Sequence, residues 1–544
     1  MADGGTGTVH AYSACMAESK SVTEASLARR ARVVGLIGLP VAALLALAVP
    51  ADAQHHARLS TGLETRLRSA NAESLNVIVT GPQSEITRLA HTYGLTIVKT
   101  LQSGGVLSGT VRQISRLADD HNLSVLQEDS IVTSTMAVTT KSTGANQVWA
   151  GGPYHTPYGG ITGREVGVAI IDSGVAYHPD VNDRILKRVD FTAATGKEGQ
   201  LLYGFDEFGH GTHLAAIVAG SGASSRTYTS PGYIGMAPGA SIISEKVLSK
   251  DGSGVVSDVI EAIDWTIAHR ERFHIQVINL SLGHVADQSA ADDPLAQAVE
   301  RAVRAGLVVD CAAGNLGKLA DGTPVVGGVI SPGFDPLVVT VGALNTHGTP
   351  DRSDDSVASY SSRGPVCDPA DTAHTQCAVK PDLVAPGNAI VSAGAVGSTL
   401  WKTHPELRVG TAYLKLSGTS QATAVVSGAV ALLLQAAPQL TPAQVKFALQ
   451  YSAEPLAHAG LIEQGAGSLN VPLAIQLAQT GPTAGAVSDT ISGNTIQAGH
   501  VVFGNSIIWG DSIIWGDSII WGDSIIWGDS IIWGDAIIWG DSAS

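Results

Sequence analysis

The sequence predicts an α/β protein: a three-layer α/β/α domain with a mainly parallel sheet, preceded by a small α+β domain. From Arg164 onward, buried strands alternate with longer helices, which is the pattern of a three-layer α/β domain. Residues 166–171 are almost continuously apolar, as in a parallel strand that is covered on both faces. Residues 75–128 follow the order β-α-β-β-α-β, which is typical of a small ferredoxin-like domain.

Composition excludes several classes of protein. The chain has 544 residues, 44% of them hydrophobic and 15% charged, so it can bury a large core. Its formal net charge is −16 and it has no run rich in Lys or Arg, so no nucleic acid partner is expected. The four cysteines show no C-x-x-C spacing for zinc. Cys367 and Cys377 could form a loop disulfide in an oxidising compartment, whereas Cys311 is expected to be a buried core thiol.

The amino-terminal segment has the layout of a signal peptide. Residues 33–49 form an apolar run, preceded by arginines at 29, 30 and 32 and followed by Ala51-Asp52-Ala53, an A-x-A cleavage site. The alternative is a membrane anchor, which Gly and Pro within the run disfavour. We expect residues 1–53 to be removed on export and the protein to be secreted, extracellular or associated with the cell surface. Whether the chain starts at Met1 or Met16 stays open.

The small domain is expected over residues 54–138. Its strands are predicted at 75–80, 95–100, 105–110 and 123–128, and its helices at 83–93 and 111–120, from apolar periodicity. Residues 133–145 are rich in Ser, Thr and small side chains, which favours an extended linker or a cleavage site.

The larger domain is expected over residues 139–478, followed by a linker at 479–504. Beyond the strand at 166–171, the pattern predicts a helix at 255–270, a strand at 277–280, a helix that begins at Pro294 and a strand at 307–312. The segment from Ser417 to Pro438 is apolar nearly all round. A helix without a polar face belongs in the centre of a domain.

Three short motifs lie at the ends of these elements. Asp172 follows the first buried strand, Gly209-His210-Gly211-Thr212-His213 surrounds an imidazole with glycines, and Ser420 lies near the start of the apolar helix. Each motif alone has a neutral interpretation, as a cap, a surface loop or a turn. Together, in the order Asp, His, Ser, they match a nucleophilic triad. An α/β-hydrolase is disfavoured because Ser420 is not in a G-x-S-x-G motif and the acid precedes the histidine.

Over residues 145–478 the chain resembles the subtilisin-like (subtilase, S8-type) serine protease family. Besides the triad motifs, the resemblance rests on further segments in family order: Gly235-Met236-Ala237-Pro238, Asp251-Gly252-Ser253-Gly254, Asn279-Leu280-Ser281-Leu282-Gly283, Ala312-Ala313-Gly314-Asn315, Tyr360-Ser361-Ser362-Arg363-Gly364-Pro365 and Lys380-Pro381-Asp382-Leu383-Val384-Ala385-Pro386-Gly387.

The resemblance implies a serine endopeptidase acting on polypeptides. His210 would take the proton from Ser420, and Asp172 would hold the histidine tautomer. The amide of Asn315 and the Ser420 N–H would receive the oxyanion. Gly252, Ser253 and Gly254, with Ser281, Leu282 and Gly283, would form two edges that pair with the substrate backbone.

The resemblance also bears on cofactors and processing. The chemistry would require neither a cofactor nor a metal, although many members of the family carry structural calcium. The small domain would be the inhibitory propeptide, which assists folding and is removed by the enzyme itself.

The chain departs from the family pattern at three places. Ala424 stands where proline is usual, Leu214 replaces the more common valine, and Ile330 stands where a glycine often forms the floor of the pocket for the residue before the scissile bond. A branched side chain at Ile330 predicts a preference for small or medium apolar residues over Phe and Tyr. His213 is expected to be packed in the core and not to serve as the base.

Residues 505–540 are six tandem hexads: Asn505-Ser-Ile-Ile-Trp-Gly, four copies of Asp-Ser-Ile-Ile-Trp-Gly and Asp535-Ala-Ile-Ile-Trp-Gly. They hold six of the nine tryptophans of the chain. Because six is even, each position keeps its face in an extended chain, and Gly-Asp marks a turn. We expect a short stack of turns or hairpins in the region 505–544. Surface attachment, self-association and carbohydrate contact all stay open as its role.

Two other readings of the whole chain are an inactive protease fold that serves as a binding module and a surface adhesive whose repeat is the functional part. The intact triad and Asn315 favour an active enzyme over both.

Overall fold

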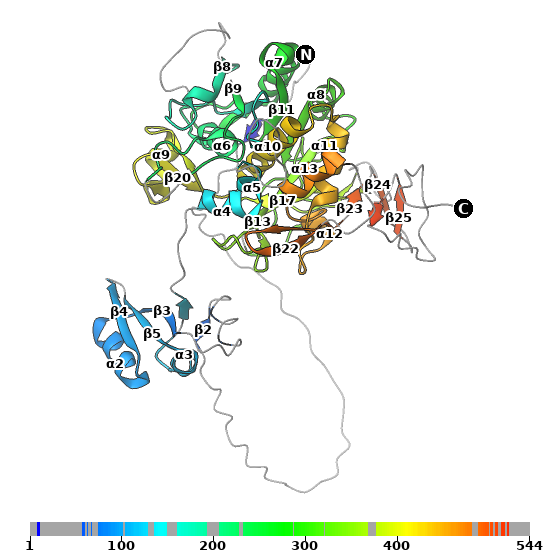
Figure 1. Ribbon diagram of the computed structural model, residues 1–544. Coiled ribbons are helices and arrows are strands. Elements are labelled where there is room, and N and C mark those ends of the chain that lie inside the picture. The colour runs from blue at the N-terminus through cyan, green and yellow to red at the C-terminus, as the bar shows by residue number, and fades with distance from the viewer. Residues whose placement is uncertain are drawn as a thin grey trace, which may run out of the picture. The chain divides into compact units, whose positions relative to one another are not determined.

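The computed structural model describes two compact units: a small unit within residues 17–132 and a large unit formed by residues 1–16 and 133–544 (Figure 1). The described residues are 8–10, 57–59, 63, 67, 74–101, 104–123, 125–128, 135–149, 160–192, 206–227, 232–286, 288–319, 321–367, 377–480, 488–499, 501–503, 506–509, 513–516 and 519–521. Apart from Thr8–His10, the predicted signal peptide at 1–53, with Met16 and the apolar run at 33–49, lies outside them.

Within its described residues, the small unit has a five-stranded sheet and the two helices α2 and α3, and it confirms the predicted β-α-β-β-α-β order. The strands lie in the order β2-β6-β3-β5-β4; the β6–β3, β3–β5 and β5–β4 pairs are antiparallel, whereas β2 pairs with β6 in parallel. Ile86 and Leu89 of α2 share a buried core with Ile114 and Leu117 of α3. The elements are β2 (Arg58–Leu59), β3 (Ser74–Thr80), α2 (Gln83–Tyr93), β4 (Thr96–Leu101), β5 (Gly104–Thr110), α3 (Val111–Ala118) and β6 (Val125–Glu128).

The large unit is built on an eight-stranded, mainly parallel sheet. The strands lie in the order β14-β13-β12-β11-β7-β9-β8, with β17 also paired to β13, and only the β13–β14 pair is antiparallel. These strands are β7 (Gly167–Asp172), β8 (Ile185–Asp190), β9 (Ser241–Lys246), β11 (Ile275–Leu280), β12 (Val308–Ala312), β13 (Val339–Asn345), β14 (Ser356–Val357) and β17 (Leu383–Pro386).

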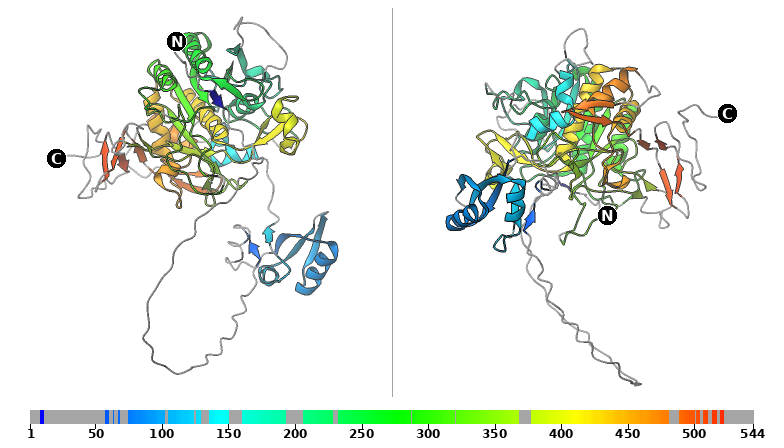
Figure 2. Two further views of the ribbon diagram at one scale, coloured as in Figure 1. Left: turned by 180° about the vertical axis from the view of Figure 1, so that it is seen from behind. Right: turned by 60° about the horizontal axis from the view of Figure 1, so that its bottom comes forward.

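Helices cover both faces of this sheet, so the predicted three-layer architecture is confirmed (Figures 1 and 2). On one face, α7 (Val256–Phe273) and α8 (Pro294–Arg304) pack on the strands through one apolar core, and the Asp293 side chain caps the start of α8. On the other face lie α6 (His210–Ala219), α10 (Thr419–Ala436), α11 (Pro442–Ser452) and α13 (Val471–Thr480) around a second core.

Helix α10 is the central element of this second core. All its residues from Thr419 to Leu434 are buried, as its apolar sequence predicts. Among the described helices, it alone is long and apolar enough to cross a membrane, and here it lies inside the large unit. The start of α10 is therefore held rigidly against the sheet.

The segment predicted as an extended linker at 133–145 is helical, so that prediction is wrong. Helices α4 (Thr135–Ser142) and α5 (Ala145–Trp149) belong to the large unit, where Met136 and Val148 join the core. The low helix propensity of its Thr and Ser residues is overridden by burial of these apolar side chains.

Beyond α13, the stretch predicted as a linker at 479–504 also contains regular structure. Strands β21 (Ser488–Ile491) and β22 (Asn494–Gln497) form a hairpin whose turn contains Ser492 and Gly493, both with positive φ. Ile491 and Ile496 are buried. The Ser-Gly pair is thus a turn that positions two apolar side chains, as expected for a two-residue hairpin loop.

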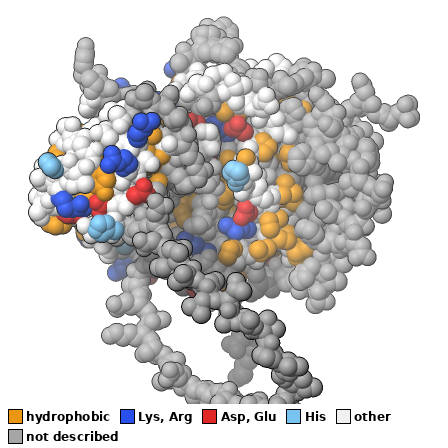
Figure 3. Space-filling model, turned by 90° about the horizontal axis from the view of Figure 1, so that it is seen from below, with side chains coloured by type: hydrophobic (Ala, Val, Ile, Leu, Met, Phe, Trp, Pro, Cys, Tyr) orange, Lys and Arg blue, Asp and Glu red, His pale blue; other side chains and the backbone are white. Residues whose placement is uncertain are grey.

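A disulfide joins Cys367 to Cys377, as the sequence allows, and clips the short strands β15 (Val366–Cys367) and β16 (Cys377–Ala378) together. The remaining described elements of the large unit, apart from the repeat, are β1 (Thr8–His10), β10 (Ser253–Val255), β18 (Ile390–Ala393), α9 (Thr399–Thr403), β19 (Arg408–Val409), β20 (Tyr413–Leu416), α12 (Leu461–Gln464), β23 (Val501–Phe503) and the 3₁₀ turns Asn182–Arg184 and Pro405–Leu407. On the face drawn in Figure 3, acidic and basic side chains are interspersed with hydrophobic and polar ones over the described residues.

Candidate active site

The three sequence motifs meet at the carboxyl edge of the main sheet. Asp172 is the last residue of β7, His210 is the first residue of α6, and Ser420 is the second residue of α10. Asn315 follows β12 in the next loop. In a parallel sheet this edge collects strand ends and helix starts, which is where ligand sites of α/β proteins form.

Asp172 and His210 form a buried pair. Nδ1 of His210 lies 2.9 Å and 3.0 Å from the two carboxylate oxygens of Asp172. Asp172 is fully buried and His210 is 6% exposed. Burial alone would lower the pKa of His210, but the charge and hydrogen bond of Asp172, with the charge of Asp206, raise that pKa above its usual value. The carboxylate thus fixes Nδ1 as the protonated nitrogen and leaves Nε2 as the basic one.

Ser420 lies beside this pair, with its hydroxyl bonded to the neighbouring loop. Its Oγ donates to the carbonyl oxygen of Ser281 at 3.1 Å, and Ser281 Oγ donates to the carbonyl oxygen of Ser420 at 2.9 Å. Nε2 of His210 lies 3.5 Å from Nε2 of Gln421, the next residue of α10. In this rotamer the Ser420 hydroxyl bonds to the Ser281 carbonyl oxygen. Catalytic hydrogen bonds are often looser before a substrate binds.

Asn315 is oriented by the first residue of α10. Its Oδ1 accepts hydrogen bonds from the N–H of Thr419 at 3.0 Å and from Thr419 Oγ1 at 3.1 Å. Thr419 Oγ1 also accepts from the N–H of Gly314 at 3.2 Å. With its oxygen anchored on Thr419, the amide nitrogen of Asn315 lies near Gly418, where an added Cβ would be 3.5 Å from Nδ2. The helix dipole at this end of α10 also favours negative charge.

A second buried carboxylate, Asp206, lies near the pair and was not among the residues expected from the sequence. Its Oδ1 accepts from Ser173 Oγ at 2.8 Å and from the Gly209 N–H at 2.6 Å, and its Oδ2 accepts from the Thr212 N–H and hydroxyl at 2.8 Å and 2.5 Å. Burial raises the pKa of Asp206, but all four partners donate, so the group acts as an ionised acceptor. It ties the start of α6 to the residue after Asp172. A carboxylate shortly before His210 was the available signal.

One predicted substrate edge is an accessible strand. Gly252 has φ +79°, and a side chain there would lie 2.5 Å from the Phe208 ring, so glycine is required. Ser253 and Gly254 belong to β10 (Ser253–Val255), whose start is fixed by the Asp251 carboxylate, bonded to Ser253 Oγ at 2.6 Å. An extended segment of the chain itself, β1 (Thr8–His10), pairs antiparallel with β10.

The other predicted edge lies across the site. Ser281, Leu282 and Gly283 follow β11, and the Ser281 hydroxyl and carbonyl both bond to Ser420 as described.

Ile330 lies beside this second edge and beside the Asn315 loop. It is buried, and a Cβ on Gly283 or Gly314 would lie 2.8 Å and 2.9 Å from its side-chain atoms. The side chain of Ile330 therefore fills the space between these two glycines.

Two residues are packed as the sequence predicts. His213 is fully buried with Nε2 3.2 Å from the Leu414 carbonyl oxygen, and burial lowers its pKa to about 3, so it is neutral. Burial raises the pKa of the Cys311 thiol well above its usual value. Within the described residues, no group of three or more His, Cys, Asp or Glu side chains is placed to hold a metal ion.

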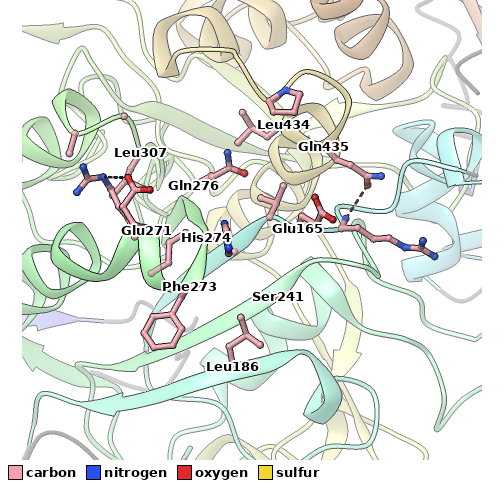
Figure 4. Close-up of a pocket in the computed structure, with 18 residues that line it drawn as sticks. Glu165, Leu186, Ser241, Glu271, Phe273, His274, Gln276, Leu307, Leu434 and Gln435 are labelled. Carbon is pink, nitrogen blue, oxygen red and sulfur yellow. Dashed lines mark hydrogen bonds and ion pairs between the residues drawn. The ribbon is translucent and has the colours of Figure 1, made fainter. Parts of the chain in front are cut away.

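A cavity of about 720 Å³ lies at the opposite edge of the sheet (Figure 4). It is lined by Glu165, Ser241, His274 and Leu307, which stand at the amino ends of β7, β9, β11 and β12. This volume lies away from the triad, so it is not the catalytic site.

The fold and this arrangement define a subtilisin-like serine endopeptidase. The chain belongs to the subtilase family, whose model matches residues 163–471. It is 40% identical over 315 residues to serine protease AprX of Bacillus subtilis strain 168, an alignment that covers 57% of this chain and 66% of AprX. It is 35% identical over 318 residues to subtilisin E of the same organism, covering 58% and 67%. Subtilisin of Bacillus pumilus is 34% identical over 318 residues, covering 58% and 93%.

Proposed function

We propose that the protein is an exported endopeptidase in which Ser420 attacks the peptide carbonyl carbon. His210 Nε2 accepts the hydroxyl proton and then donates it to the leaving amine, and Asp172 stabilises the imidazolium. The observation that carries the proposal is the Asp172–His210 pair at 2.9 Å beside Ser420 at one sheet edge. The raised pKa of His210 favours the imidazolium that forms during attack.

The oxyanion of the tetrahedral intermediate would be received by the Asn315 amide and the Ser420 N–H. The anchoring of Asn315 Oδ1 by Thr419 supports this role, because it orients the NH₂ group before the substrate arrives. No cofactor enters these steps. Structural calcium remains a proposal that rests on the family alone.

The substrate would bind as an extended strand between β10 and the segment 281–283. The pairing of β1 with β10 supports this, because it shows that this edge accepts an antiparallel strand. Main-chain pairing selects an extended peptide. Ile330 would then exclude large aromatic side chains from the pocket beside Gly283 and Gly314.

We also propose that the chain is made as a precursor. The signal-peptide layout at 1–53 and the Cys367–Cys377 disulfide both favour an oxidising, extracellular destination. The small unit has its own core, as expected of a propeptide that folds as a domain and inhibits the enzyme until it is cleaved.

The test of self-processing is the Ser420→Ala variant expressed in a protease-deficient host. We expect it to accumulate as a precursor that retains the 54–135 segment, read by intact mass and amino-terminal sequencing. Ser353→Ala, at an exposed loop serine, is the matched control and should mature like the wild type. Mature-length Ser420→Ala protein would exclude self-processing.

A further inference from the structure

The hexad repeat is attached to the large unit through a sheet edge. Strand β24 (Ser506–Trp509) pairs antiparallel with β16 of the disulfide-clipped hairpin, with Cys377 opposite Ile507. Strand β23 (Val501–Phe503) precedes it, and Val501 packs with Val379, Ala453 and Ala466. The first repeat strand therefore continues from a segment that is packed on the protease domain.

The described strands between residues 501 and 521 pair in two antiparallel ladders of a hairpin. Strand β24 pairs with β25 (Ile513–Gly516), from Ser506 opposite Gly516 to Trp509 opposite Ile513. Strand β23 pairs with β26 (Ile519–Trp521), from Val501 opposite Trp521 to Phe503 opposite Ile519. Every one of these pairs is symmetric about position 511, so both ladders share one register. Figures 1 and 2 show β24 and β25 side by side at the carboxyl-terminal end of the chain.

This register makes the hexad complementary to itself. In β24 and β25, the first Ile of a hexad lies opposite Trp, the second Ile lies opposite the second Ile, and Ser lies opposite Gly. Because the period is six, any two hexads that pair antiparallel in this register repeat the same matches. Aromatic and β-branched side chains opposite one another stabilise antiparallel strands. A hexad strand is thus the natural partner of another hexad strand.

The outer edge of this hairpin lacks two of the usual protections against strand addition, lysine and proline. Among the described residues, β25 and β26 each pair on one side only. Edge strands usually avoid pairing with other chains through lysine or proline, and residues 505–540 contain no Lys, Arg or Pro. We propose that this edge, β25 and β26, binds the same edge of a second copy of the chain, so that the repeat holds two proteases together.

The other candidate occupant is the rest of the repeat, residues 523–540. A further hexad strand from the same chain would cover β25 and β26 but would expose the same pattern one strand further out. The repeat therefore supplies a self-complementary edge whichever strand is outermost. We take the edge formed by β25 and β26 to be the one that binds the second copy.

The test exploits the second Ile of each hexad. In any register that places the first Ile of a hexad opposite Trp, the second Ile lies opposite the second Ile of the other strand. Ile514 and Ile520 of one copy would therefore lie opposite Ile514 or Ile520 of the other. Two variants are made in the Ser420→Ala background, which prevents self-digestion: Ile514→Lys with Ile520→Lys, and Ile514→Glu with Ile520→Glu. Like charges placed directly opposite destabilise a strand pair, whereas opposite charges stabilise it. Sedimentation velocity over a concentration series measures association of the full chain.

We expect the parent to show a faster-sedimenting species, each variant alone to lose it, and an equimolar mixture of the two variants to regain it. The mixture separates a loss of pairing from misfolding, because misfolded variants would not associate when they are mixed. A parent that stays monomeric overturns the proposal, as do variants that associate like the parent or a mixture that fails to regain the species. Peptide hydrolysis by the same variants with Ser420 restored should match the wild type, so this test is independent of the catalytic proposal.

A second signature comes from charge. Five of the six hexads have one charged residue, an Asp at their first position, whereas the first hexad has Asn505 there. The self-complementary register places first positions opposite one another, so Asp lies opposite Asp in the two copies. Salt screens such repulsion. Association should therefore strengthen as ionic strength rises, and a weakening would contradict this register.

Discussion

The two edges of the main sheet differ in what their polar groups do. At the carboxyl edge, Asp172 bonds to His210, and Ser420 exchanges hydrogen bonds with Ser281. At the amino edge a cavity of about 720 Å³ opens, but none of the described side-chain contacts joins its serine, Ser241, to its histidine, His274. Converging hydrogen bonds, rather than cavity volume, identify the chemical site.

The amino edge nevertheless contains backbone strain. Glu165 and His274 both have positive φ, at 67° and 51°. Their neighbourhood is stabilised by Gln435, whose Oε1 accepts the N–H groups of residues 162, 163 and 164 at 2.6–3.0 Å. These bonds satisfy backbone donors and contact no reactive group, so this edge supports the fold. Strain alone is thus a poor guide to function here.

The largest expected effect at the carboxyl edge, short of removing the triad, is that of Asn315→Leu. The amide acts on charge that exists only in the transition state, so kcat should fall while KM stays nearly constant. We expect kcat to fall about 100- to 1,000-fold. This range is taken from the removal of such a hydrogen-bond donor in a subtilisin. Steady-state kinetics on a peptide substrate measures it. A change confined to KM would assign Asn315 another role.

The Ile330→Gly variant should alter selectivity rather than rate on small residues. Removing the side chain between Gly283 and Gly314 opens space for an aromatic ring, and misfits of this size change selectivity by about 10- to 200-fold. A peptide library varied at the residue before the scissile bond should show a gain for Phe and Tyr. Aromatic preference already in the wild type, unchanged in the variant, would remove Ile330 from the pocket.

The Asp206→Asn variant tests whether the second carboxylate tunes His210. The charge of Asp206 contributes to the raised pKa of His210, and the base must be neutral to accept a proton. Loss of that charge lowers the pKa, so the acid limb of the kcat/KM profile should move to lower pH.

We expect a loss in kcat of roughly tenfold as well, below the roughly hundredfold that a 1 Å misplacement can cost. Asp183→Asn, at an exposed acidic residue, is the matched control and should leave the pH profile in place. An unmoved acid limb in the Asp206→Asn variant would restrict that residue to a structural role.

The smallest kinetic effect is expected at the amino edge. Gln435→Ala leaves three backbone N–H groups without their acceptor, which should lower the free energy of unfolding by about 1–3 kcal/mol. Thermal denaturation measures this loss, and kcat/KM at a temperature where both proteins are folded should be unchanged. A specific loss of activity would show that the amino edge couples to the site.

Much of the fold was predictable because its signals are local. A few residues suffice to predict three of its elements: the strand before Asp172, the start of the helix at Pro294 and the buried helix α10. Helices α4 and α5 were not predictable, since the burial of Met136 and Val148 that stabilises them depends on the tertiary fold.

The site divides in the same way. Asp172, His210, Ser420 and Asn315 are identifiable because each lies in a short motif at an element end. Asp206 was missed because it lies outside those motifs, and its role depends on donors from two separate segments, at Ser173 and at residues 209–212. Contacts of this kind are visible only in three dimensions.

The most direct test of the central claim is active-site labelling of the mature protein with a fluorophosphonate, followed by peptide mapping by mass spectrometry. We expect a single adduct on Ser420 in the wild type. The amount of this adduct should be strongly reduced in His210→Ala, because the serine then lacks its base. Absence of an adduct on Ser420 in folded wild-type protein, or labelling that is unchanged in His210→Ala, would contradict it.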